Sequence, residues 1–262
     1  MLFQFGLVQW YKRFLTAFKL STKVIVNCKF SNINIPNSVQ QMRIVGPESL
    51  TICLLTSCFV GMVFTLQVAK EFLYLDATSI IGAILTIAFT RELSPVLTSV
   101  ILVGRIGSSF TAEIATMQIT EQIDALYVLR SDPISYIVFP RLLACILMLP
   151  LLNIIALATS LSSSIFICFT LYNIHPSIFL TSAYSSLSSE DIFKSLLKAV
   201  IFGFIIASIS CTWGLTTTGG AKGVGQSTTS SVVTSLLTIF VVDFVLSYLM
   251  FHNLDSAIKT LS

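Results

Sequence analysis

Long apolar runs dominate the chain, and they predict its architecture. Each run has about the 20 residues that an α-helix needs to cross a bilayer. Runs of this length favour membrane spans over the buried helices of a soluble protein. Five spans are expected, at about 49–69, 79–103, 142–171, 194–216 and 229–251.

The composition supports an all-α membrane protein. Hydrophobic residues make up 55% of the 262 positions, charged residues make up 10%, and the mean hydropathy is +0.90. A soluble domain averages about 25% charged residues. The six cysteines lack metal-ligand spacing and are interpreted as small buried hydrophobes, and there are only two histidines. We therefore expect no metal site, no cofactor and no catalytic residue.

The amino-terminal segment has its own pattern. Its large apolar side chains share one face at helical spacing, and its basic side chains lie opposite. This predicts an amphipathic helix in the membrane interface, with packing on the protein's own spans as the alternative. A linker is expected at 26–47, around Pro36. The chain is thus divided into 1–47 (interfacial helix and linker), 48–252 (spans) and 253–262 (short tail).

The distribution of charge sets the orientation. Six basic residues precede the first acidic residue, Glu48, which favours an amino terminus on the side of synthesis. The connection at 104–140, rich in small polar residues, and the one at 217–228 are then inside. Those near 70–78 and 172–192 are outside, as is the carboxyl end. Basic residues are sparse and bordered by spans, so binding of nucleic acid is not expected.

Arg91 and Glu92 lie in the middle of an apolar run. A charge at the bilayer centre costs about 2.5–3.5 kcal/mol on insertion scales, so each needs a partner or water. Neighbours on a helix do not face each other, and Lys198 and Asp243 are candidate partners. The charges form a structural ion-pair network, line a polar cavity, or do both. Alternatively, they mark a break between two re-entrant segments.

Two polar segments between the spans also suggest roles. In TEQIDAL, Ile123 and Leu126 share one face and Glu121 and Asp124 share a neighbouring one, so a soluble protein could grip this helix in a groove. An ordinary solvated helix is the alternative. GAKGVGQS (220–227) imitates a phosphate-binding loop but has Gln226 in place of the lysine and follows no strand, so a flexible turn is expected.

The sequence RELSPVLTSVILVGRIGSSFTAEIATMQITEQIDALYVLRSDPISYIVFPR, at 91–141, resembles the MlaE family of ABC transporter permeases. These are lipid-trafficking proteins of bacterial inner membranes and plastid inner envelopes. Later motifs at 196–214, 219–233 and 241–251 match in order and spacing. The resemblance implies a homodimer that binds an ABC ATPase subunit and an MCE-type lipid-binding protein, with a membrane lipid as substrate.

The resemblance also implies roles for particular residues. The lipid cavity would include Phe64, Arg91, Glu92 and Leu93. A cytoplasmic-side coupling helix would dock in the ATPase through Glu121, Gln122, Ile123, Asp124, Ala125 and Leu126. Ser94 and Ala115 stand where the family usually has glycine.

The function expected is that of a lipid-transporting ABC permease subunit, without enzymatic activity of its own. The main alternative is a stand-alone secondary transporter or channel using the intramembrane charges. An intramembrane enzyme would need a nucleophile and base that the sequence does not supply. An AT-rich residue usage and the absence of a transit peptide favour a plastid-encoded protein of the inner envelope. A bacterial inner membrane is the alternative.

Overall fold

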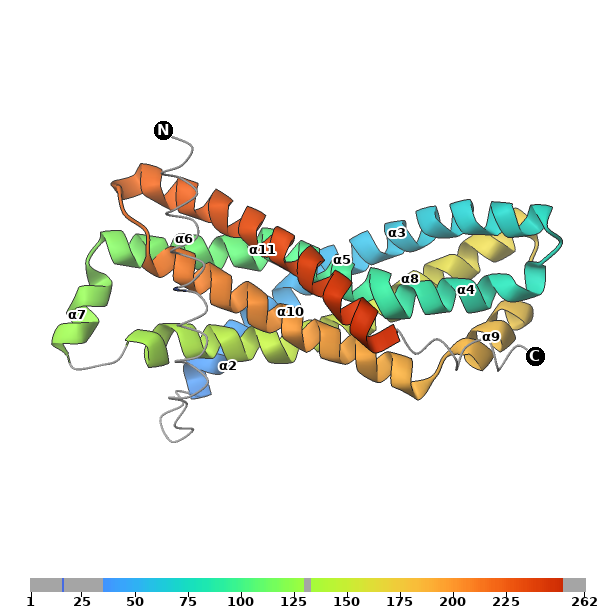
Figure 1. Ribbon diagram of the computed structural model, residues 1–262, viewed down its shortest axis with the longest axis horizontal. Helices are drawn as coiled ribbons and strands as arrows, with labels where there is room; N and C mark the ends of the chain where they lie inside the picture. The colour runs from blue at the N-terminus through green and yellow to red at the C-terminus, as the bar shows by residue number, and fades with distance from the viewer. Residues whose placement is uncertain (1–15, 17–34, 130–132, 252–262) are drawn as a thin grey trace. The chain divides into compact units, whose positions relative to one another are not determined.

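The computed structural model describes residues 16, 35–129 and 133–251. The expected interfacial helix and the tail at 253–262 lie outside the described residues. Within them the chain is helical throughout, with short turns between helices (Figure 1). η2 is a 3₁₀ turn and η3, η4 and η5 are π-helical. The elements are α2 (Ile35–Val45), α3 (Pro47–Tyr74), η2 (Thr78–Ile80), α4 (Ile81–Ala88), η3 (Phe89–Leu93), α5 (Ser94–Leu102), η4 (Val103–Gly107), α6 (Ser108–Ile119), α7 (Gln122–Val128), η5 (Ile134–Val138), α8 (Phe139–Tyr172), α9 (Pro176–Ser186), α10 (Ser189–Leu215) and α11 (Gly220–Phe251).

Five helical segments in the described part of the chain are long and apolar enough to cross a membrane. This confirms the prediction of an all-α membrane protein with five spans. Because successive spans alternate in direction, α7 and the α10–α11 turn belong to one side of the membrane. The spans are Ile35–Tyr74, Thr78–Ile119, Ile134–Tyr172, Ser189–Leu215 and Gly220–Met250.

The second span is longer than the sequence suggested. Its helix continues without a break to Ile119, so the alternative of two re-entrant segments was wrong, and the connection expected from 104 begins as part of the same helix. The small polar residues of this helix are accommodated because their hydroxyls bond to its own carbonyls. Ser108 donates to Gly104 O at 2.5 Å, Thr111 to Gly107 O at 2.8 Å, and Thr116 to Ala112 O at 2.8 Å.

Three expected loops also contain helices. Part of the predicted linker forms α2, and the connection at 172–192 contains α9. The Gly-rich segment at 220–227 is the first two turns of α11, so a flexible turn was wrong there. The turn itself covers 216–219, and at its end Gly219 and Gly220 have φ values of +96° and +67°, which favour glycine.

The chain divides into two compact units. Unit 1 comprises 1–49, 99–149 and 200–239, and unit 2 comprises 50–98, 150–199 and 240–262. The long helices α3, α8, α10 and α11 each contribute residues to both units.

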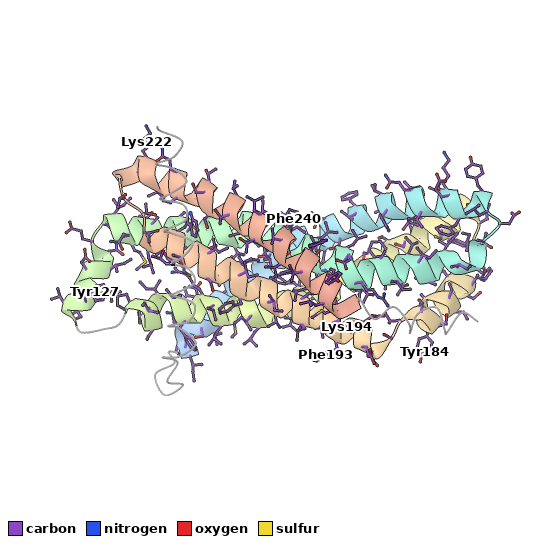
Figure 2. All side chains as sticks on the ribbon, viewed as in Figure 1. Tyr127, Tyr184, Phe193, Lys194, Lys222 and Phe240 are labelled. Atoms are coloured by element: carbon purple, nitrogen blue, oxygen red, sulfur yellow. The ribbon has the colours of Figure 1, made fainter. Side chains whose placement is uncertain are left out.

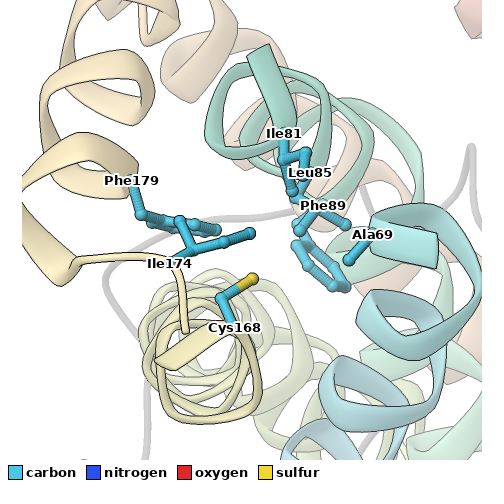
Figure 3. Packing of buried hydrophobic residues seen from close by; sticks show 7 residues of the cluster. All are labelled: Ala69, Ile81, Leu85, Phe89, Cys168, Ile174 and Phe179. Carbon is cyan, nitrogen blue, oxygen red and sulfur yellow. The ribbon is translucent and has the colours of Figure 1, made fainter. Parts of the chain in front are cut away.

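In unit 2, apolar side chains of α3, α4, η3, α8 and α9 gather in one buried cluster (Figure 3). Close approach of helices supports it. A Cβ on Gly61 of α3 would lie 2.9 Å from Ser160 Cα of α8, so only glycine fits without displacement. The cluster comprises Ala69, Ile81, Leu85, Phe89, Cys168, Ile174 and Phe179.

Candidate functional site

Arg91 and Glu92 both lie in the π-helical turn η3, within the second span. Arg91 forms a bidentate ion pair with Asp191, near the start of α10, in which Nε–Oδ1 and Nη2–Oδ2 are both 3.1 Å. Asp191 was not among the predicted partners because it falls in a segment, 172–192, that was expected to be a loop. The available signal was its spacing, since Asp191 precedes Lys198 by seven residues and so shares a face of α10 with it.

Glu92 belongs to a second group, centred on the buried ammonium of Lys198. Lys198 Nζ lies 3.0 Å from Glu92 Oε2 and 3.0 Å from Asp243 Oδ1 of α11. It also lies 2.7 Å from Ser247 Oγ and 2.9 Å from the Arg91 carbonyl oxygen. The Lys198 side chain is 0% exposed, so these partners offset a desolvation cost that would otherwise be severe.

The backbone of η3 takes part in this network. Its wider turn is closed by a bond from the Ser94 N–H to Phe89 O, one residue longer than the α-helical register. Such π-turns are rare and occur frequently at functional sites. The Arg91 carbonyl in this turn accepts a bond from Lys198, so α10 binds η3 through backbone as well as side chains.

A neutral hydrogen-bonded chain continues from the same place. Ser94 Oγ lies 2.6 Å from Asn153 Oδ1 and 3.0 Å from the Asn153 carbonyl oxygen on α8. Asn153 Nδ2 then donates to Ser195 Oγ of α10 at 2.9 Å. Ser94, which stands where the resemblance predicts glycine, therefore supplies a hydrogen bond between helices.

An apolar groove lies on α3, with a volume of about 250 Å³. Phe64 contributes to it and also meets Phe89 edge to face, with ring centroids 5.6 Å apart. Leu93 packs on the same buried cluster as Phe64. Arg91, Glu92 and Leu93 are not among the groove's lining residues, which are Phe59, Val60, Val63, Phe64 and Gln67.

The short helix α7 turns off the end of α6, between the second and third spans (Figure 1). Glu121 forms the corner with φ +58°, a left-handed conformation that costs a non-glycine residue about 1–2 kcal/mol. Ile123 is only 3% exposed, so it holds α7 against the chain instead of joining the exposed face. Leu126 is half-buried, and the exposed residues are Glu121, Gln122, Asp124 and Ala125.

Apolar side chains continue this exposed face. Tyr127, Val128 and Leu129 are all exposed at the end of α7, and Figure 2 shows Tyr127 there. The sequence analysis ended its candidate helix at Leu126 and did not include them.

Five spans, paired charges within them and an exposed helix between two of them are the features of a multi-pass membrane protein. A comparison with protein families supports this class, since the family described as "Permease MlaE" matches residues 38–249. The chain belongs to the MlaE permease family, which confirms the resemblance found in the sequence.

Comparison with individual proteins supports the same family assignment. The chain is 57% identical to the probable ABC transporter permease protein ycf63 of Pyropia yezoensis, over 97% of each protein. It is 54% identical to a probable ABC transporter permease protein of Synechocystis, over 93% of each. It is 46% identical to the chloroplastic protein TRIGALACTOSYLDIACYLGLYCEROL 1 of Arabidopsis thaliana, over 92% of this chain and 69% of that protein. The chain thus groups with plastid and cyanobacterial members of the family.

Proposed function

We propose that this chain is the membrane-spanning subunit of an ABC transporter that moves a phospholipid or a related lipid across or out of the plastid inner envelope. A separate subunit hydrolyses ATP. The observation that carries the proposal is the exposed helix α7, placed between two spans of an MlaE-family permease. ATP can drive a lipid only if the permease has different lipid affinities in two conformations, and α7 would select between them.

The exposed face of α7 suits a protein partner. Glu121, Gln122 and Asp124 offer charge and hydrogen bonds, and Tyr127 to Leu129 offer apolar area beside them. Such a mixture of a polar rim and apolar anchors is typical of protein–protein interfaces. We assign the ATPase to this face, with Ile123 fixing the helix to its own chain and Leu126 lying at the edge.

The α3 groove is the candidate lipid site. Its volume of about 250 Å³ is below the roughly 300–1,000 Å³ of sites that enclose even a drug-sized ligand. It is lined by one helix only, so a second wall is needed to surround an acyl chain. We propose that a second copy of this chain supplies that wall, in a homodimer. The sequence resemblance further supports an MCE-type lipid carrier as a partner.

The intramembrane charges have a structural role in this proposal. Each of Arg91, Glu92, Lys198 and Asp243 contacts an opposite charge in the described structure. A stand-alone channel or secondary transporter would need some of these groups to face a passing ion. Their mutual pairing favours the ABC permease over that alternative.

The docking assignment is tested by reversing two charges of α7. The double variant Glu121→Lys, Asp124→Lys should lose the ATPase subunit when the complex is co-purified. Glu190→Lys is the matched control, because Glu190 is exposed and belongs to the start of α10, outside the helix under test. Retention of the ATPase by the double variant would remove α7 from the interface.

The groove is tested with a photo-crosslinking residue in place of Val63, which lines it. Exposed membrane helices touch bulk lipid everywhere, so the informative quantity is the change in lipid crosslinking when ATP is added. We expect a change at Val63 and none for the same probe at Phe193, an exposed site on α10. An equal response at both positions would count against a lipid site on α3.

A further inference from the structure

We propose that the ion pair between Glu113 and Arg141 is a positioning element of the transport cycle, because it joins the two ends of the arm that carries α7. The proposal rests on the assignment of α7 to the ATPase. Glu113 is on α6 and Arg141 is on α8, and the arm at 114–140 lies between them. A movement of α7 then reaches the second and third spans together.

The ion pair is short, and its arginine is buried. Arg141 Nη2 lies 2.7 Å from Glu113 Oε2, and the Arg141 side chain is 8% exposed. Its guanidinium also stacks over Phe110, with Cζ 5.3 Å from the ring centroid. Ser109 Oγ donates to the second carboxylate oxygen at 3.1 Å. The Glu113 side chain is 44% exposed, so the arginine is the buried partner of the pair. Charge-assisted hydrogen bonds are stronger than those between neutral groups.

Arg141 depends on this one carboxylate. Its Nε and Nη1 are buried, and neither has a hydrogen-bond acceptor among the described residues. If the pair separated, the whole guanidinium would be buried without an acceptor, at a high cost in desolvation. A second ion pair among the described residues of unit 1 is weaker, since Arg105 and Glu48 are 3.9 Å apart and both are partly exposed. The two ends of the arm are therefore held together firmly.

The α6 end is in turn fixed to two other spans. Thr111, two residues before Glu113, bonds Ser231 Oγ of α11 at 2.9 Å and the Ser210 carbonyl of α10 at 3.2 Å. A Cβ on Gly214 of α10 would lie 2.7 Å from Ile114 Cβ, so these helices are in close contact. Displacement of the arm would thus be transmitted to α8 through Arg141 and to α10 and α11 through α6.

The experiment uses the complete transporter reconstituted in vesicles, with Glu113→Gln, and measures phospholipid transferred per ATP hydrolysed. Gln keeps the shape and removes the charge. We expect co-purification of the ATPase and ATP hydrolysis to persist while transfer per ATP falls about tenfold, within the usual range of coupling between sites. Glu190→Gln, which removes an exposed pair with Lys194, is the control and should keep the wild-type ratio.

A second variant separates coupling from folding. Exchanging the charges, with Glu113→Arg and Arg141→Glu together, should recover part of the lost transfer per ATP. A wild-type ratio in Glu113→Gln overturns the proposal, and so does loss of assembly in that variant, because the pair would then only hold the fold. If the wild-type complex itself shows no ATP-dependent transfer, the proposed function fails instead.

Discussion

Units 1 and 2 both bury polar side chains within spans, but these side chains find hydrogen-bond and ion-pair partners to different degrees in the two units. In unit 2 the charges form two groups of ion pairs, Arg91 with Asp191 and Lys198 with Glu92 and Asp243. Among the described residues, every buried side-chain nitrogen or oxygen atom that lacks a hydrogen-bond partner belongs to unit 1. These atoms are Gln41 Oε1, Ser49 Oγ, Arg105 Nη1, Arg141 Nε and Nη1, Ser208 Oγ, Ser210 Oγ, Trp213 Nε1 and Ser235 Oγ.

This difference indicates that the two units have different roles. A buried polar group without a partner costs about 1–3 kcal/mol, so unit 1 has less to lose when its helices rearrange. Unit 1 also carries α7, where the ATPase is proposed to act. Unit 2 binds its charges tightly and is suited to keep the α3 groove in shape.

The largest effect is expected from removing the ammonium that unit 2 is built around. Lys198→Met leaves Glu92 and Asp243 without their shared partner and should destabilise the protein by about 3–5 kcal/mol. The measurement is thermal or denaturant unfolding in nanodiscs. Lys194→Met is the control, because Lys194 lies one turn earlier on α10 and its side chain is only partly buried. It should lower the free energy of unfolding by less than about 1 kcal/mol. Equal, small effects would mean that the network does not hold unit 2 together.

A smaller effect is expected from filling the contact between α3 and α8. Gly61→Ala in unit 2 places a methyl group against the Ser160 backbone and should cost about 1–3 kcal/mol. Gly225→Ala in unit 1 is the matched change, since nothing lies within 4 Å of its Cβ position. It should be neutral or stabilising through helix propensity. The same unfolding assay decides, and a larger loss at Gly225 would reverse the comparison.

The smallest loss of stability is expected from removing a hydrogen bond between uncharged side chains of unit 2. Ser94→Ala removes the donor to Asn153 and should cost about 0.5–1.5 kcal/mol. Ser162→Ala provides the control, because that hydroxyl is exposed and bonds only to its own helix at Ala158 O. Indistinguishable unfolding midpoints for the two variants would show that the Ser94 bond adds no stability.

Much of this architecture could be predicted from the sequence. Apolar length alone gave five spans, because a bilayer of fixed thickness demands it. The cost of burying charge pointed from Glu92 to Lys198 and Asp243, which the structure brings into contact. The second span was predicted to end at 103 and the fifth to begin at 229, because Ser, Thr and Gly are typical of loops, whereas the helices extend to Ile119 and from Gly220. In the fold their hydroxyls bond to the helix carbonyls.

Other parts of the site depend on tertiary structure and had weaker signals. Asp191 was not predicted as a partner because its helix was expected to begin later in the chain, at 194. No sequence feature indicates the π-helical turn η3. Ile123 was grouped with the docking residues because helical spacing shows which side chains share a face but not which face is covered. The pairing of Glu113 with Arg141 joins residues 28 positions apart and needs the arm between them to fold back.

The central claim is that ATP hydrolysis in a separate subunit moves lipid through this chain by way of α7. Its most direct test is phospholipid transfer between donor and acceptor vesicles by the reconstituted complex, for the wild type and for Glu121→Lys, Asp124→Lys. The account predicts that transfer requires ATP and the ATPase subunit and is abolished in the double variant. Transfer at an unchanged rate without the ATPase, or in the double variant, would contradict it.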